Sequence, residues 1–218
     1  MGIFMNKKKK QEPEPINDDG WKAIEEAFAK VYPGQEERKH YGVLIPWMLG
    51  GPDPLDGISV YDGGDCWHFV TFGLSELYEK QSQDKEFSGY GMEFTMRLKK
   101  GCYAPEDEES EIKCVISNLQ NIAKLTFQNG ELFLPWEYIY TGQKNGIDFH
   151  HTATLNGFIT VPDTKIPPIV TPNGKLEFVE FIGATDAELV AIQNKQLNVK
   201  GLFEKIGDVT DYLRPSVV

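Results

Sequence analysis

The clearest strand signal in the chain is SGYGMEFTMRLK, residues 88–99. Apolar side chains occupy every second position of this run, namely Tyr90, Met92, Phe94, Met96 and Leu98. The positions between them hold Gly91, Glu93, Thr95, Arg97 and Lys99. Because successive side chains of a strand point to opposite faces, the pattern predicts one packed face and one face that meets water or a partner.

One helix is predicted before this strand in the sequence and another after it. After it, residues 112–127 carry one apolar stripe at helical spacing, and Gly130 supplies a C-terminal stop. Before it, a first helix is predicted to begin near Asp18 and to end before Pro33. Its apolar residues also lie at helical spacing, and they are Trp21, Ile24, Phe28 and Val31.

Shorter apolar runs, divided by glycine and proline, predict further strands. They are residues 43–48, 58–61, 66–72, 132–140, 157–161 and 175–182. Asn173 and Gly174 predict a hairpin turn, and the spacing of Thr185 and Glu188 predicts a capping box on a short helix. Runs of strands with few helices between them predict an α+β fold, a mixed or antiparallel sheet flanked by a few helices in a single compact domain.

Composition and charge exclude several classes of protein. The 218 residues are 40 % hydrophobic and 25 % charged, which is typical of a globular protein. The net charge is −11 and no basic stripe is present, so we expect no nucleic-acid binding, whereas a basic partner would be attracted. No apolar run is long enough to span a membrane. Three cysteines without a Cys-x-x-Cys pair are typical of reduced thiols, and we expect a cytoplasmic protein.

The start of the chain differs from the rest. Residues 1–17 contain four consecutive lysines and a run rich in proline and glutamate, which bury too little apolar area to fold. No secretion signal is recognised, because the lysines follow the first apolar residues instead of preceding them. The sequence therefore predicts a disordered tail over residues 1–17 and one domain over residues 18–218.

Candidate catalytic residues give a weak signal. Cys66 and His68 could form part of a zinc site, but both lie on one face of an apolar run, where a buried histidine bonded to a backbone carbonyl is the commoner outcome. No nucleophile or phosphate-binding motif is complete. We predict no cofactor and no enzyme activity. The alternative left open is a metal-dependent hydrolase that uses His68, Asp56 and Glu93.

The densest unusual sequence is GGPDPLDGISVY, residues 50–61. Its prolines fix φ and its glycines allow φ values that other residues do not hold, so the run predicts a rigid loop. In that loop Asp56 is expected to accept hydrogen bonds from backbone amides of the turn. The residues predicted to build the loop are Gly50, Gly51, Pro52, Asp53, Pro54, Asp56 and Gly57.

Three runs in fixed order, residues 50–61, 67–78 and 88–98, closely resemble the suppressor of fused domain. His68, Tyr78 and Gly91 belong to the second and third of these motifs. Animal members of this family bind and restrain a zinc-finger transcription factor of the Hedgehog pathway, and they hold a short partner segment as an added strand between two lobes. The present chain looks like the first lobe alone and is similar to bacterial stand-alone members.

The resemblance implies a function without catalysis. Bacterial members of this type are regarded as immunity proteins that neutralise polymorphic toxins by direct binding. It implies a protein-binding module whose partner is another protein, such as a basic toxin domain. The partner-binding surface would fall near Leu125, Glu137 and Tyr138, although Leu125 stands where animal members tend to carry an aromatic residue and Glu137 where they carry aspartate.

Overall fold

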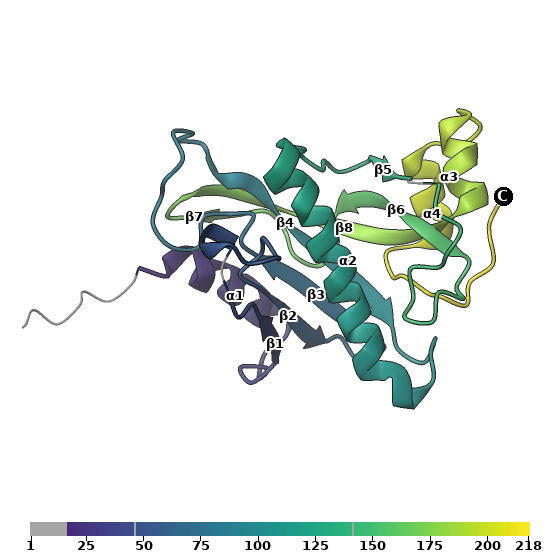
Figure 1. Cartoon of the computed structure of the whole chain (residues 1–218), viewed down its shortest axis with the longest axis horizontal. Helices are drawn as coiled ribbons and strands as arrows, with labels where there is room; N and C mark the ends of the chain where they lie inside the picture. Colours follow the sequence, from purple (N-terminus) through teal and green to yellow (C-terminus); the bar gives the residue numbers. More distant parts are fainter. Residues whose placement is uncertain (1–16, 46, 141) are drawn as a thin grey trace, which may run out of the picture.

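The computed structural model describes residues 17–45, 47–140 and 142–218. These residues form one open sheet of eight strands (Figure 1). Its order is β1 (Lys39–Gly42), β2 (Gly57–Asp62), β3 (Cys66–Phe72), β4 (Phe87–Lys99), β8 (Gly174–Thr185), β6 (Leu155–Pro162) and β5 (Tyr138–Ile139), and β7 (Ile169–Thr171) pairs with β8. Strands β4 and β8 run parallel and the other pairs are antiparallel. The predicted α+β class with a mixed sheet is confirmed.

One face of the sheet is covered by α2 (Glu108–Asn129), which crosses it diagonally in Figure 1. The helix buries Ile112, Val115, Leu119, Ile122 and Ala123 against the apolar side of β4, including Met92, Phe94, Met96 and Leu98. Gly130 ends the helix with a left-handed φ of +71°, a conformation that glycine adopts without strain. The predicted long helix and its stop signal are confirmed.

The opposite face is covered by two groups of helices. The first is α1 (Asp19–Val31), whose Phe28 packs between Tyr61 and Phe178 with ring centroids 4.9 and 5.7 Å away. The second group is α3 (Asp186–Gln193) and α4 (Val199–Ile206), which pack on β6 and β8. The capping box of Thr185 and Glu188 opens α3 as predicted, whereas no helix was predicted over 199–206.

Two predicted strands are wrong. Of the residues predicted as a strand over 43–48, those that the structure describes form no strand, and a short 3-10 helix, η1 (Trp47–Leu49), begins at the end of the run. Of residues 132–140, only Tyr138–Ile139 form a strand. Prolines at positions 46 and 135 interrupt both runs, and a proline supplies no N–H donor to a ladder. Trp136 also has a φ of +74°, which no regular strand accommodates.

The second face of β4 differs from its prediction. Instead of meeting water or a partner, Glu93 and Thr95 are fully buried and Arg97 is only 2 % exposed. Polar partners from distant parts of the chain surround these side chains. The Arg97 guanidinium, for example, lies 2.7 and 2.8 Å from the two carboxylate oxygens of Glu180. Alternation alone predicts a half-buried strand, because the pattern does not reveal that a second layer with matching polar groups covers this face.

The loop that precedes β2 contains the glycine- and proline-rich motif. Gly50 has a φ of +85°, and Gly51 and Pro54 are buried while Pro52 is exposed. Asp53 pairs with Lys124 of α2 at 3.2 Å. A Cβ on Gly57 would lie 2.5 Å from the His40 ring, so a larger residue here would require that ring to move. In β4, Gly91 has a φ of +73° beside an irregularity in its pairing with β8.

Two further findings concern whole-chain features. No helix in the described part of the chain has both the length and the apolar character needed to cross a membrane. The three cysteines are free, and burial raises the pKa of each thiol to about 11, which makes them poor nucleophiles. The tail predicted over residues 1–17 lies outside the described residues except for its last position.

Candidate partner-binding edge at strand β5

Strand β5 ends the sheet and has a neighbouring strand, β6, on one side only. The Thr160 N–H donates to the Glu137 carbonyl at 2.9 Å, and Tyr138 stands opposite Ile159 at the next ladder position. Hydrogen-bonded and non-bonded positions alternate along an antiparallel pair. The N–H and C=O groups of Tyr138 therefore point away from β6, where they could pair with another strand.

The segment that leads into β5 is held in an irregular conformation. The Trp136 N–H donates to the Thr160 carbonyl at 2.7 Å, and the Thr160 hydroxyl donates to the Leu134 carbonyl at 2.7 Å. The Glu137 carboxylate accepts from the Leu134 N–H at 2.9 Å. Alternate side chains of this segment are exposed to solvent, and they are Leu132, Leu134, Trp136 and Tyr138. The result is a fixed row of apolar groups beside an open strand edge.

A pocket of about 510 Å³ lies between β5 and the α3–α4 region. Trp136 and Tyr138 form one side of it, and Leu197, Val199 and Lys195 belong to the other. The Trp136 ring packs edge-on against Phe203 at 5.8 Å, and the Lys200 ammonium lies 4.9 Å from the centre of the Trp136 ring. These contacts hold Trp136 in place, so the pocket is formed without a partner.

The structure places the three predicted partner-binding residues in different settings. Tyr138 is 39 % exposed on β5 and lines the pocket. Glu137 precedes it, but its carboxylate is used to bind the Leu134 backbone. Leu125 is 36 % exposed in the C-terminal part of α2. Sequence reasoning missed Trp136 and the α4 wall, although the alternation of large apolar residues from 132 to 138 was a usable signal.

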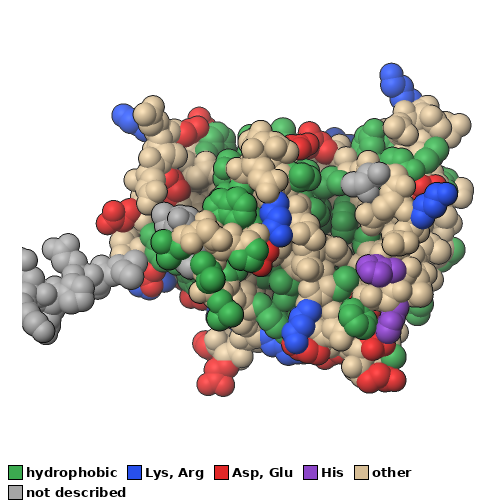
Figure 2. Space-filling view, viewed as in Figure 1, with side chains coloured by type: hydrophobic (Ala, Val, Ile, Leu, Met, Phe, Trp, Pro, Cys, Tyr) green, Lys and Arg blue, Asp and Glu red, His purple; other side chains and the backbone are tan. Residues whose placement is uncertain are grey.

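Figure 2 shows the surrounding surface in the orientation of Figure 1. Hydrophobic side chains gather in the middle of this face, and many acidic side chains lie toward its rim. Among the aromatic residues of the sequence motifs, Tyr78 and Tyr90 are exposed, and the Tyr90 ring packs on Phe127 of α2, whereas Tyr61 is buried. The face therefore combines apolar area with an acidic surround.

The three residues considered for a metal-dependent hydrolase do not form one site. His68 is fully buried, with Nδ1 2.8 Å from the Tyr32 hydroxyl and Nε2 2.9 Å from an Asp163 oxygen. Burial lowers the pKa of His68 and the adjacent Asp163 carboxylate opposes that effect. The predicted backbone partner of His68 is thus replaced by two side chains. Both ring nitrogens are occupied, which leaves none for a metal ion.

The two carboxylates of that alternative are also held separately. Glu93 accepts hydrogen bonds from the Gly73 and Ser75 N–H groups at 2.9 Å and from the Thr71 hydroxyl at 2.5 Å. Asp56 lies against the Tyr78 hydroxyl, so the expected bonds to turn amides are replaced by a side-chain contact, and burial raises its pKa. Among the described residues, no group of three or more His, Cys, Asp or Glu side chains could hold a metal ion.

Comparison with known proteins identifies the family. Residues 51–215 match the family model described as Suppressor of fused protein (SUFU). The chain belongs to the Suppressor of fused family. The match includes nearly all of the three motifs on which the resemblance was based, so that prediction is confirmed.

Individual Suppressor of fused relatives agree with this assignment. The human and mouse Suppressor of fused homologs are each 29 % identical to the chain over an aligned length of 206 residues, and each match covers 87 % of this chain and 40 % of the relative. The chain thus spans about 40 % of the length of these curated relatives.

Solved structures from the family share the fold. A structure titled the Sufu-Fu complex has a TM-score of 0.77 and 26 % identity, and the match covers 92 % of this chain and 93 % of that one. Drosophila Suppressor of Fused has a TM-score of 0.76 and 27 % identity, with 95 % of this chain and 54 % of that one covered.

Proposed function

We propose that this chain is a non-catalytic protein-binding domain that takes an extended partner segment as an added strand on β5. The observation that carries the proposal is the outward pair of backbone groups on Tyr138 beside a preformed pocket. Strand addition obtains affinity from backbone hydrogen bonds and specificity from pockets for alternate side chains. A related structure is titled a Sufu-Fu complex, so a similar protein assembles with a second one.

The pocket indicates what the segment should carry. Its walls combine aromatic and aliphatic side chains with the polar Gln196 and Asn198. Lys195 also lines the pocket, and the Lys200 ammonium lies close by over Trp136. We therefore expect an apolar or acidic side chain to enter the pocket. The apolar row formed by Leu132 and Leu134 extends the contact surface along the chain.

The net charge of −11 acts at longer range. Attraction between unlike charges accelerates encounter more than it strengthens the final complex. This supports a partner that is basic overall, and a basic toxin domain neutralised by direct binding is a partner of that kind. If so, the association rate should fall steeply as salt rises, whereas a rate that is indifferent to salt would contradict this part of the proposal.

The strand-addition mechanism is tested by substituting Tyr138 in two ways. Tyr138→Ala and Tyr138→Pro both remove the phenol ring, but only proline also removes the outward N–H donor, and proline is tolerated on edge strands. Each variant and the unmodified protein would be used to capture partners from cells that make the chain. We expect a specific partner to be retained by the Ala variant, with weakened binding, and to be lost with the Pro variant.

Amide hydrogen exchange on the captured complex provides the second measurement. Protection should appear in residues 136–140 when the partner is bound. Equal retention of the partner by the Pro variant, with unchanged thermal unfolding of that variant, would show that β5 does not pair with the partner. A partner that protects other segments only would lead to the same conclusion.

A further inference from the structure

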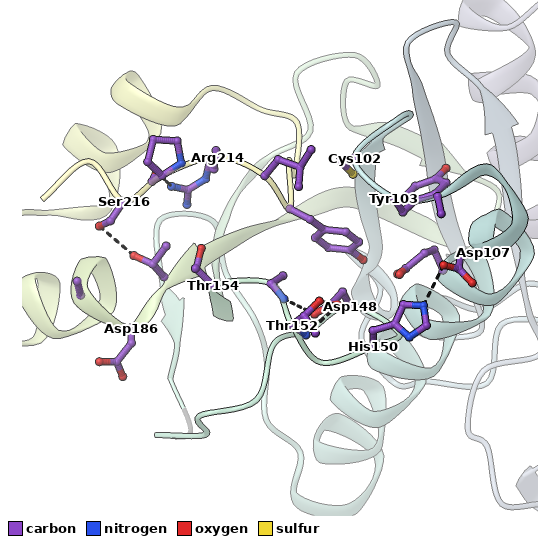
Figure 3. A pocket seen from close by; sticks show the side chains of 18 residues that line it. Cys102, Tyr103, Asp107, Asp148, His150, Thr152, Thr154, Asp186, Arg214 and Ser216 are labelled. Carbon is purple, nitrogen blue, oxygen red and sulfur yellow. Dashed lines mark hydrogen bonds and ion pairs between the residues drawn. The ribbon is translucent and has the colours of Figure 1, made fainter.

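A second and larger pocket lies away from β5, with a volume of about 850 Å³ (Figure 3). Four parts of the chain form it: residues 102–111, which lead into and begin α2, the loop 148–154, residues 185–187 at the start of α3, and the C-terminal segment 212–216. None of residues 136–140 lines it. Its volume is within the range of pockets that hold small molecules.

The charges in this pocket are unbalanced. Its one arginine, Arg214, is neutralised by Glu188, with two contacts of 2.6 and 2.7 Å. His150 is exposed and lies 2.9 Å from Asp107. Asp186 accepts a hydrogen bond from the Tyr140 hydroxyl, and Glu111 and Asp148 remain. His150 is close enough to lower the pKa of Glu111, but no lysine or arginine of the described residues forms an ion pair with Glu111 or Asp148. The pocket therefore has an excess of negative charge.

Asp148 is fixed as a carboxylate. Its oxygens accept from the Ala153 N–H at 2.8 Å and from the Thr152 N–H at 3.0 Å. Burial opposes ionisation, but these hydrogen bonds outweigh it and lower the pKa of Asp148. These hydrogen bonds favour the charged form of Asp148, so the loop 148–154 places a negative charge at the pocket wall.

Glu111 is the less satisfied carboxylate. It is 1 % exposed, and one of its oxygens accepts from the Phe149 N–H at 3.0 Å. Burial raises its pKa, and the charge of Asp148 raises it further. A buried carboxylate beside a second one is stabilised by a nearby cation, since the opposite charge offsets desolvation and repulsion.

The Tyr212 hydroxyl supplies an independent observation. Tyr212 lines the pocket, is 6 % exposed, and its buried oxygen has no hydrogen bond of ordinary geometry among the described residues. The hydroxyl is nevertheless close enough to Glu111 to lower the pKa of that carboxyl group. Buried polar atoms without a partner cost free energy. A ligand with N–H donors would satisfy both groups together.

From these observations we propose that the pocket binds an organic cation, an ammonium or guanidinium group on a short aliphatic chain, with its N–H groups directed at Glu111 and Tyr212. A metal ion fits poorly, because the carboxylates are spread around the wall and no three ligands converge in the described part of the chain. Ala153, Leu213 and Pro215 provide apolar wall for methylene groups. A free amine and a basic side chain of a protein share this chemistry.

Calorimetric titration tests the proposal with the whole chain. Cadaverine and spermidine represent free amines, the peptide Gly-Arg-Gly represents a basic side chain, and 1,5-pentanediol is the uncharged control. We expect saturable binding of at least one cation at millimolar concentrations or below, and none of the diol. If the amines bind more tightly than the peptide, the ligand is a free amine; if the peptide binds more tightly, the ligand is a basic side chain of a protein. If no cation binds saturably, the proposal is wrong.

Three variants locate the binding. Glu111→Gln keeps an acceptor for the Phe149 N–H and should weaken binding at least tenfold, while Tyr212→Phe should weaken it several-fold. Glu106→Gln is the matched control, because Glu106 is exposed in the turn before α2 and does not line the pocket. An equal loss in the control would show non-specific attraction to an acidic surface and overturn the proposal. Thermal unfolding of each variant shows whether the fold is intact.

This site is independent of the proposed strand addition. Tyr138→Pro should leave cation binding unchanged, and Glu111→Gln should leave partner capture through β5 unchanged. Failure of one experiment therefore does not imply failure of the other.

Discussion

The two faces of β4 are buried to the same degree but by different means. On one face Met92, Phe94 and Met96 pack under α2 in a continuous apolar cluster. On the other face Glu93 stands beside Phe178 of the apolar cluster under α1, and Arg97 pairs with Glu180, which lies along β8 between that cluster and the one under α3 and α4. One strand thus contributes both to a close-packed apolar layer and to a polar layer. The difference shows that alternation in a sequence reports two environments without showing that one of them is solvent.

The faces depend on their neighbours differently. Apolar packing requires volume and shape, and many residues can supply these. Each polar group of the second face requires a particular partner, because a buried polar atom without one is costly. Arg97 forms ion pairs with Glu180 and Asp208, and the Thr95 hydroxyl donates a hydrogen bond to Asp163. We therefore expect substitutions on the polar face to be the more damaging, even where they increase hydrophobicity.

The largest effect is expected from Arg97→Met. The substitution leaves Glu180, which is fully buried, without its bidentate partner, and breaking a buried pair in this way costs about 3–5 kcal/mol. Urea unfolding measures the loss. The matched control is the double variant Arg97→Met with Glu180→Leu, which removes both charges and should recover most of the stability. A single variant as stable as the unmodified protein would show that the pair is not needed.

A second effect should appear in the pH dependence of stability. Burial raises the pKa of Glu93 from 4.5 to about 7, although hydrogen bonds from Thr71, Ser75 and Gly73 oppose the shift. Because the folded pKa lies above the unfolded one, the stabilising contribution is complete below about pH 4.5 and is lost as pH rises toward 7. The contribution of Glu93 to the free energy of unfolding should fall by up to about 3 kcal/mol over this window.

Glu93→Gln isolates that contribution, since the amide cannot ionise. Its oxygen still accepts from Gly73 and Ser75, and its NH₂ group donates to Thr71. The variant should show a flatter profile between pH 4.5 and 7, measured by urea unfolding at several pH values. Glu177→Gln, at an exposed position of β8, should keep the profile of the unmodified protein. If Glu93→Gln also keeps that profile, Glu93 is ionised throughout this pH range in the folded protein.

Sequence alone predicted the parts of the fold that depend on local signals. The limits of β3, the stop at Gly130, the turn at Asn173 and the capping box at Thr185 all follow from periodicity or turn chemistry within a few residues. The polar layer could not be predicted in this way. Arg97 and Glu180 are 83 residues apart, and no local sequence pattern in either segment indicates that the two side chains form a pair.

The candidate site was predicted only in part for the same reason. The resemblance to a family led to Tyr138, but the pocket beside it requires Trp136 and residues of α4 such as Val199, which come together only when the sheet has formed. Trp136 also adopts a φ of +74° that no propensity favours. Tertiary contacts select that conformation, since Trp136 is fixed by Thr160 on one side and Phe203 on the other.

The smallest and most direct test compares two neighbours in β4. Thr95→Val is nearly isosteric and more hydrophobic, but it removes the 2.7 Å hydrogen bond to the buried Asp163 carboxylate and should cost about 1.5–3 kcal/mol. Met96→Leu conserves volume on the apolar face and should cost less than about 1.5 kcal/mol. Urea unfolding of both variants at neutral pH gives the comparison. If Met96→Leu proves the more damaging, the stability of this sheet depends on shape on its apolar face more than on pairing in its polar layer, and the contrast between the faces fails.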